Sequence, residues 1–350
     1  MTQSRKGAAR AVGQALRLGC LCASLLGLGL RPASAAEDPP RAASPAVAAS
    51  IAPLHSLAAM VMRGVGEPKL LLRPTASAHS QTLRPSEAAA LADADLVLWV
   101  GPDLEAGLIQ PIATLARKAE IATLGAEPGL VIHQLRRGPR WGGNALKRAA
   151  AAWRAAQAAA SGAGGSGAQE SASERVRDPH FWLDPENAAL WLRRIADRLA
   201  ALDPPRAARY RENAAAAAAE LDALSAEIAS ALRPAAGRPF VVHHDAYRYF
   251  EARYGLAAVG AVAAPGLRPS PARLAAIQTQ IAETGAVCVF TEPQFDTDLA
   301  RVAARGAGAR VAAIDPLGAA LAPGAELYPR LMRRLTEAFR DCLTDRTTAQ

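Results

Sequence analysis

The sequence of 350 residues lacks several features that mark membrane proteins and nucleic-acid-binding proteins. After residue 36 it has no run of 18 uncharged apolar residues, whereas a membrane-spanning helix needs about 20. It also has no block rich in lysine and arginine with interleaved aromatic side chains, and aromatic residues make up only 5% of the chain. We therefore expect a soluble mature protein, and nothing in the sequence supports nucleic-acid binding.

The N-terminal segment, residues 1–36, has the pattern of a secretory signal peptide. It carries five basic residues and no acid, and four of the basic residues precede an apolar run of 13 residues from Leu18 to Leu30, which is too short to span a bilayer. The small residues Ala33-Ser34-Ala35 then predict cleavage after Ala35 or Ala36. A weak membrane anchor is the alternative interpretation.

The same segment carries much of the chain's positive charge and two of its cysteines. Its removal lowers the formal net charge from +8 to about +3, because five basic residues leave with it. The remaining surplus is spread out, as on a solvated surface. Arg17 stands three residues before Cys20, where a lipoprotein signal has leucine, so we do not expect lipidation of Cys20 or Cys22.

Only two of the four cysteines, Cys288 and Cys342, remain in the mature chain. Export places them in an oxidising compartment, where a pair of cysteines is expected to form a disulfide. Two buried free thiols are the alternative.

Short apolar or β-branched runs alternate with helical stretches along the chain, which is typical of parallel βα units. Because about 315 mature residues exceed one ordinary core, we expect an α/β fold of two (β/α) lobes with mainly parallel sheets. The predicted strands are Ala46–Ile51, Lys69–Leu72, Asp95–Val100, Glu120–Leu124, Phe240–His243, Ala257–Val262, Val287–Thr291 and Arg310–Ile314.

The predicted boundaries follow from this alternation. Residues 37–203 form the N-terminal lobe, which includes a low-complexity segment at 125–177 that we expect to be a flexible loop. Residues 204–234 form a linker helix, and residues 235–350 form the C-terminal lobe. The linker contains one long predicted helix from Arg206 to Leu232, which we interpret as a rigid connector between the lobes. We expect a cleft between the two lobes, and we expect the cleft to hold a metal site formed by the residues described next.

Five polar side chains at predicted strand ends or in the loops that follow them are candidates for chemistry: His79, His180, His244, Glu292 and Asp315. Ligands of open α/β sheets bind beyond the carboxyl ends of the strands, so these side chains can converge on one cleft. Three imidazoles and one oxygen ligand would suit a tetrahedral zinc ion. The alternative is that each histidine is a core or capping residue bonded to backbone.

The other three histidines are weaker candidates. His243 precedes His244 on the same predicted strand and should point to the opposite face. His55 lies in the first turn of a predicted helix, where packing is the better interpretation. His133 is the only histidine in the segment 125–177.

Five motifs are spread along the mature chain: ASAHSQTLRPSE with ADADLVLWVGPDLE (76–105), HFWLDPENA (180–188), HHDAYRYFEARYGL (243–256), CVFTEPQF (288–295) and IDPLG (314–318). In these motifs and in their order the chain resembles the zinc-binding substrate-binding proteins of ABC importers, the ZnuA-type members of the cluster 9 family. The resemblance covers essentially the whole mature length except 125–177.

The resemblance implies specific residue roles. It implies His79, His180 and His244 as zinc ligands and a bridge between Cys288 and Cys342. Relatives that bind manganese tend to carry a carboxylate at the third position, so a histidine there favours zinc. The fourth ligand is then expected to be Asp315, Glu292 or water, in that order. The sequence lacks the histidine- and acid-rich loop of many zinc-binding members.

The function implied by the resemblance is capture of Zn²⁺ in the periplasm and delivery to an ABC importer, with a membrane permease and, through it, a cytoplasmic ATPase as partners. We expect a monomer that is not an enzyme. Binding of manganese or iron within the same family, or a metal-binding adhesin, is one alternative. A secreted zinc hydrolase with Glu292 as general base is another, although the sequence has no H-E-x-x-H motif.

Overall fold

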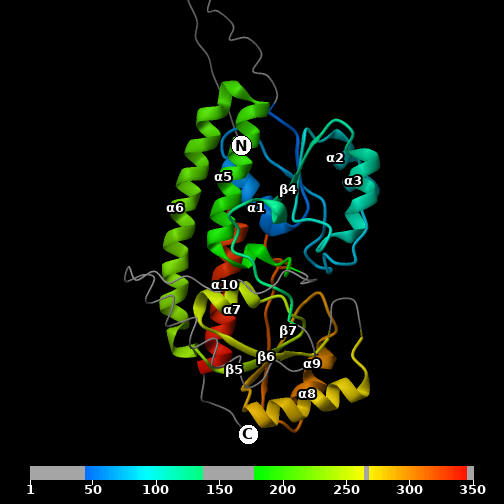
Figure 1. Ribbon diagram of the computed structural model, residues 1–350, viewed down its shortest axis with the longest axis vertical. Helices are drawn as coiled ribbons and strands as arrows, with labels where there is room; N and C mark the ends of the chain where they lie inside the picture. Colours follow the sequence, from blue (N-terminus) through cyan, green and yellow to red (C-terminus); the bar gives the residue numbers. More distant parts are fainter. Residues whose placement is uncertain (1–43, 137–176, 264–267, 345–350) are drawn as a thin grey trace, which may run out of the picture. The chain divides into compact units, whose positions relative to one another are not determined.

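Two four-stranded parallel sheets form the framework of the protein in the computed structural model, which describes residues 44–136, 177–263 and 268–344 (Figure 1). The strand orders are β2-β1-β3-β4 and β6-β5-β7-β8. The strands are β1 (Val47–Ala49), β2 (Lys69–Leu70), β3 (Leu96–Trp99), β4 (Glu120–Thr123), β5 (Pro239–Val242), β6 (Ala257–Ala261), β7 (Cys288–Thr291) and β8 (Arg310–Ala313).

Seven of the eight strands fall within the predicted segments and β5 begins one residue before its segment, which confirms the α/β prediction with parallel sheets. The central strands β1, β3, β5 and β7 are apolar runs because helices cover both faces of a parallel sheet. In β3, for example, all four residues of LVLW are buried. The predicted signal segment and residues 137–176 of the predicted flexible loop lie outside the described residues.

The two sheets share one topology. In each sheet the first strand lies between the second and the third. The second strand is therefore added on one side of the first strand, and the later strands are added on the other side. Such a switch point leaves a crevice at the carboxyl ends of the strands. The ends of β1 and β3 meet there in the first sheet, and the ends of β5 and β7 meet there in the second.

The helices begin and end at the expected local signals. Asp184 caps α5 by accepting a hydrogen bond from the backbone N–H of Glu186, and Ser270 caps α8 in the same manner. The α-helices are α1 (Ala52–Val61), α2 (Pro85–Asp93), α3 (Ile109–Leu115), α5 (Pro185–Leu202), α6 (Ala207–Leu232), α7 (Arg248–Tyr254), α8 (Pro271–Thr284), α9 (Thr297–Ala304) and α10 (Leu327–Thr344). Among the described residues, no helix is both long and apolar enough to cross a bilayer.

The long helix predicted at Arg206–Leu232 is α6, which runs alongside α5 in Figure 1. Its buried residues recur at steps of three or four, which turns one stripe of the helix toward its neighbours. The helix packs against α5 and α10, and it contacts α1 beside the first sheet and α7 beside the second. The buried residues are Tyr210, Ala214, Ala217, Leu221, Leu224, Ile228 and Leu232.

A disulfide joins Cys288 in β7 to Cys342 in α10, as predicted. The bond closes a sequence separation of 54 residues. It fixes the last helix of the chain to a central strand of the second sheet.

Replacing both cysteines with alanine is expected to lower the free energy of unfolding by about 4 kcal/mol, because the unfolded chain regains the entropy of a long loop. Urea unfolding of the oxidised protein and of the double variant measures this difference. A loss below about 1 kcal/mol would contradict a major stabilising role for the bond.

A fully buried glutamate, Glu105, lies at the switch point of the first sheet. Its carboxylate accepts hydrogen bonds from the Ser50 hydroxyl, from the backbone N–H of Gly101 at 2.8 Å and from that of Val100 at 3.3 Å. Burial raises the pKa of Glu105 from 4.5 to about 7, and these three hydrogen bonds offset only part of the increase.

The raised pKa of Glu105 predicts a pH-dependent stability. Between pH 4.5 and 7 the folded chain binds this proton more tightly than the unfolded chain, so the stabilisation is complete below 4.5 and is lost as pH rises through 7. The change amounts to about 3 kcal/mol at 1.36 kcal/mol per pKa unit. Urea unfolding at several pH values should show the wild type losing about this much more stability than Glu105→Gln over the range, since other buried groups such as Asp178 titrate in both proteins, and parallel profiles would contradict it.

Candidate metal centre

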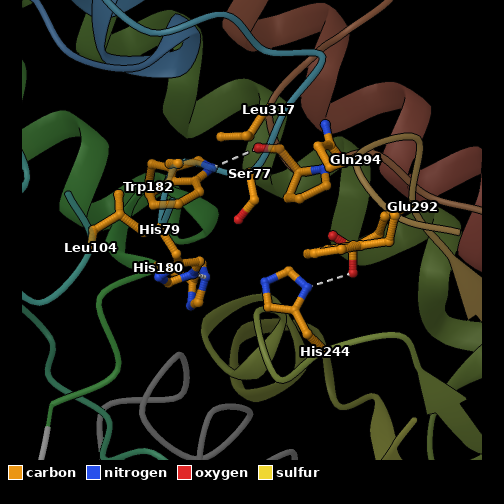
Figure 2. Close-up of a pocket in the computed structure, with 12 residues that line it drawn as sticks. Ser77, His79, Leu104, His180, Trp182, His244, Glu292, Gln294 and Leu317 are labelled. Carbon is orange, nitrogen blue, oxygen red and sulfur yellow. Dashed lines mark hydrogen bonds and ion pairs between the residues drawn. The ribbon is translucent and has the colours of Figure 1, made fainter. Parts of the chain in front are cut away.

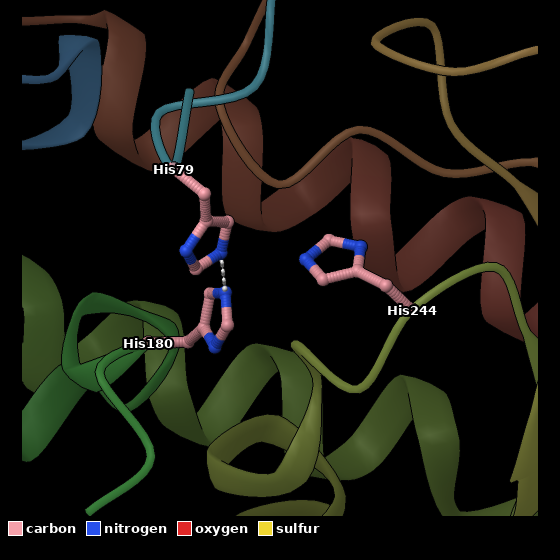
Figure 3. A group of neighbouring side chains, drawn as sticks. All are labelled: His79, His180 and His244. Carbon is pink, nitrogen blue, oxygen red and sulfur yellow. Dashed lines mark hydrogen bonds between the residues drawn. The ribbon is translucent and has the colours of Figure 1, made fainter. Parts of the chain in front are cut away.

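Three histidines that are far apart in the sequence lie together (Figure 3). One ring nitrogen from each of His79, His180 and His244 lies within 4.8 Å of the others, and no other such group of potential metal ligands occurs among the described residues. The Nε2 atoms of His79 and His180 are 3.3 Å apart. The ring centroid of His244 lies 5.3 Å from that of His180 and 5.9 Å from that of His79.

Each histidine comes from a different part of the fold. His244 follows β5 at the switch point of the second sheet. His180 immediately precedes the short 3-10 helix Phe181–Leu183, which leads into α5. His79 lies in the loop between β2 and α2. The cluster therefore brings together segments of both sheets within one compact unit.

Carboxylates orient two of the three rings. Nδ1 of His180 lies 2.7 Å from Asp178 Oδ1, and Nδ1 of His244 lies 2.7 Å from Glu292 Oε1. An ionised carboxylate can only accept in such a pair, so we assign the proton to Nδ1 in both rings for that form. Nε2 then carries the lone pair, which is the arrangement found in carboxylate–histidine–metal sites. Burial raises the pKa of Asp178 to about 7, so Asp178 is only partly ionised at neutral pH.

Burial and charge set the protonation of the rings. Burial, with smaller effects from the neighbouring His180 and His244, lowers the pKa of His79 to about 2. Burial also holds the pKa of His180 well below 6.5. For His244 burial acts in the same direction, but the Glu292 carboxylate outweighs it and raises the pKa. His79 and His180 are thus neutral at physiological pH, with lone pairs available to a cation.

The pocket around the cluster is small (Figure 2). Its enclosed volume of about 20 Å³ has room for little more than one water-sized sphere, so it suits an ion better than a small organic molecule. The hydroxyl of Ser77 points into it in Figure 2. Beyond the histidines, the lining residues are Ser77, Ala78, Leu104, Trp182, Glu292, Gln294, Phe295, Pro316 and Leu317.

The structure places the two candidate carboxylates differently from the predicted order. Glu292 lines the pocket and contacts His244, whereas Asp315 does not line it. The Asp315 carboxylate instead accepts hydrogen bonds from the Gln294 side chain and from three successive backbone N–H groups, those of residues 317–319. This placement does not favour Asp315 as the first candidate for a fourth ligand.

The remaining histidines lie outside the cluster. His55 bonds through Nε2 to the carbonyl oxygen of Pro68 at 3.0 Å. His243 stacks on Phe295 with ring centroids 4.4 Å apart, and His133 packs against Tyr249. These contacts fit structural roles.

One residue near the site carries no recognisable signal in the sequence. Arg136 donates hydrogen bonds to Asp245 and Glu251 across more than 100 residues of sequence, and all three side chains are largely buried. Asp245 directly follows His244. Arg136 lies in the segment that we expected to be a flexible loop, yet residues up to 136 contact the second sheet's α7 and its preceding loop.

Comparisons with known proteins agree with this arrangement. The family described as "Zinc-uptake complex component A periplasmic" (ZnuA) matches residues 47–342. High-affinity zinc uptake system protein ZnuA of Brucella suis is 40% identical over 311 residues, covering 85% of this chain and 91% of the relative. The protein of the same name from Paracoccus denitrificans is 40% identical over 307 residues, covering 87% and 94%. A crystal structure of ZnuA shares the fold, with a TM-score of 0.68 and 22% identity, covering 85% of this chain and 98% of that chain.

Proposed function

Because the chain belongs to the ZnuA family of periplasmic zinc-uptake components, we propose that His79, His180 and His244 bind the zinc ion that it captures. The observation that carries this proposal is the spacing of the ring nitrogens. In a tetrahedral site with Zn–N bonds of about 2.0–2.1 Å, two ligand nitrogens are about 3.3–3.4 Å apart. The Nε2 atoms of His79 and His180 are 3.3 Å apart.

The protonation of the rings suits rapid capture. His79 and His180 are already neutral, so no proton has to leave them before a metal ion binds. The His244 imidazole has a raised pKa, so a fraction of it must lose a proton from Nε2 when the ion arrives. Glu292 retains the Nδ1 proton in its hydrogen bond and keeps the ring aimed at the ion.

We assign the fourth coordination position to solvent rather than to a carboxylate. Oε1 of Glu292 is used by His244, and a shift of this carboxylate to the ion would release that ring. Asp315 is held away by its four hydrogen bonds. The Ser77 hydroxyl, which points into the pocket, is placed to bond a bound water.

The chain acts as a binding component and not as an enzyme, in keeping with its family. It belongs to the periplasm, and we propose that residues 1–36 are removed after Ala35 or Ala36. We further propose that the zinc-loaded monomer docks on an ABC permease that is driven by a cytoplasmic ATPase.

Competition with a chromogenic chelator tests the proposal. The mature protein should bind one zinc ion per chain tightly, and manganese should compete poorly, since three imidazoles favour zinc over a harder ion. Preferential binding of manganese would instead support the manganese- or iron-binding alternative, and no tight binding of either ion would contradict the proposed site.

A further inference from the structure

His79 differs from the other two histidines in how its ring is held. His180 and His244 each have a carboxylate on Nδ1, whereas His79 has no carboxylate partner within the described part of the chain. Its one hydrogen-bond-length contact there is the 3.3 Å approach of its Nε2 to that of His180. The position of His79 therefore depends on the backbone of its own loop, residues 73–81.

Within this loop, the Gln81 side chain forms hydrogen bonds with the loop's own backbone. Its side chain accepts a hydrogen bond from the backbone N–H of Arg73 at 3.0 Å. It donates to the carbonyl oxygens of Arg73 at 2.8 Å and of Ala76 at 2.9 Å. The loop also lies tightly on Gly107, where an added Cβ would clash with the Gln81 carbonyl oxygen. These contacts fix the shape of the loop but not its distance from the second sheet.

Gln294, in the segment that follows β7, connects the loop 73–81 to the second sheet. Its side-chain nitrogen donates to the carbonyl oxygen of Pro74 at 2.7 Å and to Asp315 Oδ1 at 2.9 Å. Asp315 is itself fixed by backbone N–H groups, so it anchors the glutamine. Gln294 also lines the metal pocket, two residues after Glu292.

We infer that Gln294 is a positioning residue for zinc binding: it ties the loop that carries His79 to the sheet that carries His244, and so sets the separation of these two ligands. The inference rests on the proposed zinc site. It also gives Asp315 a role as the anchor of this tie. Loss of the side-chain N–H groups of Gln294 would release the loop, while the backbone N–H groups of residues 317–319 would still hold the Asp315 carboxylate.

The variant Gln294→Met tests the inference, because methionine has a similar length but cannot donate to Pro74 or Asp315. The matched control is Gln278→Met, since Gln278 also donates through its side-chain nitrogen to backbone carbonyls, but within the second sheet's helical layer. Should Gln294→Met fold poorly, Gln294→Leu also lacks the N–H donors and brings no charge or metal ligand into the pocket. Circular dichroism establishes folding for each variant.

Two measurements separate the steps of the inference. Hydrogen exchange by mass spectrometry on the metal-free proteins should show faster exchange of residues 73–81 in Gln294→Met, but not in Gln278→Met. Zinc affinity from chelator competition should fall about 10-fold in Gln294→Met, the size expected for loss of an outer-shell partner, and stay unchanged in the control. The visible absorption of the cobalt-loaded variant should change as well, since the ligand geometry is altered.

If hydrogen exchange of residues 73–81 is unchanged in Gln294→Met, Gln294 does not hold this loop and the inference is wrong. Faster exchange with unchanged zinc affinity and an unchanged cobalt spectrum would also overturn the inference, because the contact would then be structural only. A wild-type protein that binds no zinc would contradict the proposed function itself, and this outcome is distinguishable because the exchange measurement is made without metal.

Discussion

Replacement of His180 with alanine is expected to weaken zinc binding by at least ~100-fold. The His180 ring contacts those of both other histidines, and its Nδ1 is held by Asp178. A structural zinc site contributes roughly 10–16 kcal/mol, so one of four ligands accounts for about 2.5–4 kcal/mol. Chelator competition on the wild type and the variant measures this loss.

The matched control for this prediction is His55→Gln. His55 is also buried, but it bonds to the carbonyl oxygen of Pro68 and lies outside the cluster. Its replacement should leave the zinc affinity within about threefold of the wild type, which is the usual scatter of single-site effects. Equal losses in both variants would mean that the histidines act through folding and not as ligands.

Replacement of Arg136 with methionine is expected to lower the free energy of unfolding by about 3–5 kcal/mol. The substitution leaves the carboxylates of Asp245 and Glu251 buried without their shared cation, and a broken buried ion pair costs about this much. The side chains of these three residues are only 13%, 11% and 7% exposed. Urea unfolding of the metal-free protein gives the value directly.

An exposed pair serves as the comparison for Arg136. Arg333 donates to Glu227 from α10 to α6, but the two side chains are 47% and 52% exposed. Such pairs are worth about 0–1 kcal/mol, so Arg333→Met should change stability little. A similar small change in Arg136→Met would show that the buried network is not a stabilising feature of the site.

The sequence was sufficient to predict the framework and the core of the site. Buried strands of a parallel sheet are continuous apolar runs, so LVLW at 96–99 and CVFT at 288–291 were recognisable without a structure. His244 and Glu292 follow directly after such runs. Because the carboxyl ends of strands at a switch point converge, both residues were expected at one edge of the sheet, but their contact at 2.7 Å is known only from the structure.

The contacts that hold the site could not be predicted in this way. Gln294 bonds to Pro74 across 220 residues, and Arg136 bonds to Asp245 across 109 residues. Neither pair has a periodicity or spacing that marks it, since loops set these contacts. Asp315 shows the same limit: it ends a strand, as a ligand would, but the turn that follows it uses its carboxylate.

The most direct test of the zinc site is diffraction from crystals of the zinc-loaded mature protein, recorded on both sides of the zinc absorption edge. We expect one strong anomalous peak per chain, within about 2.0–2.1 Å of Nε2 of His79, His180 and His244, with Asp315 still bonded to Gln294. A peak bonded to other residues, or the absence of a peak at the three histidines, would contradict the account.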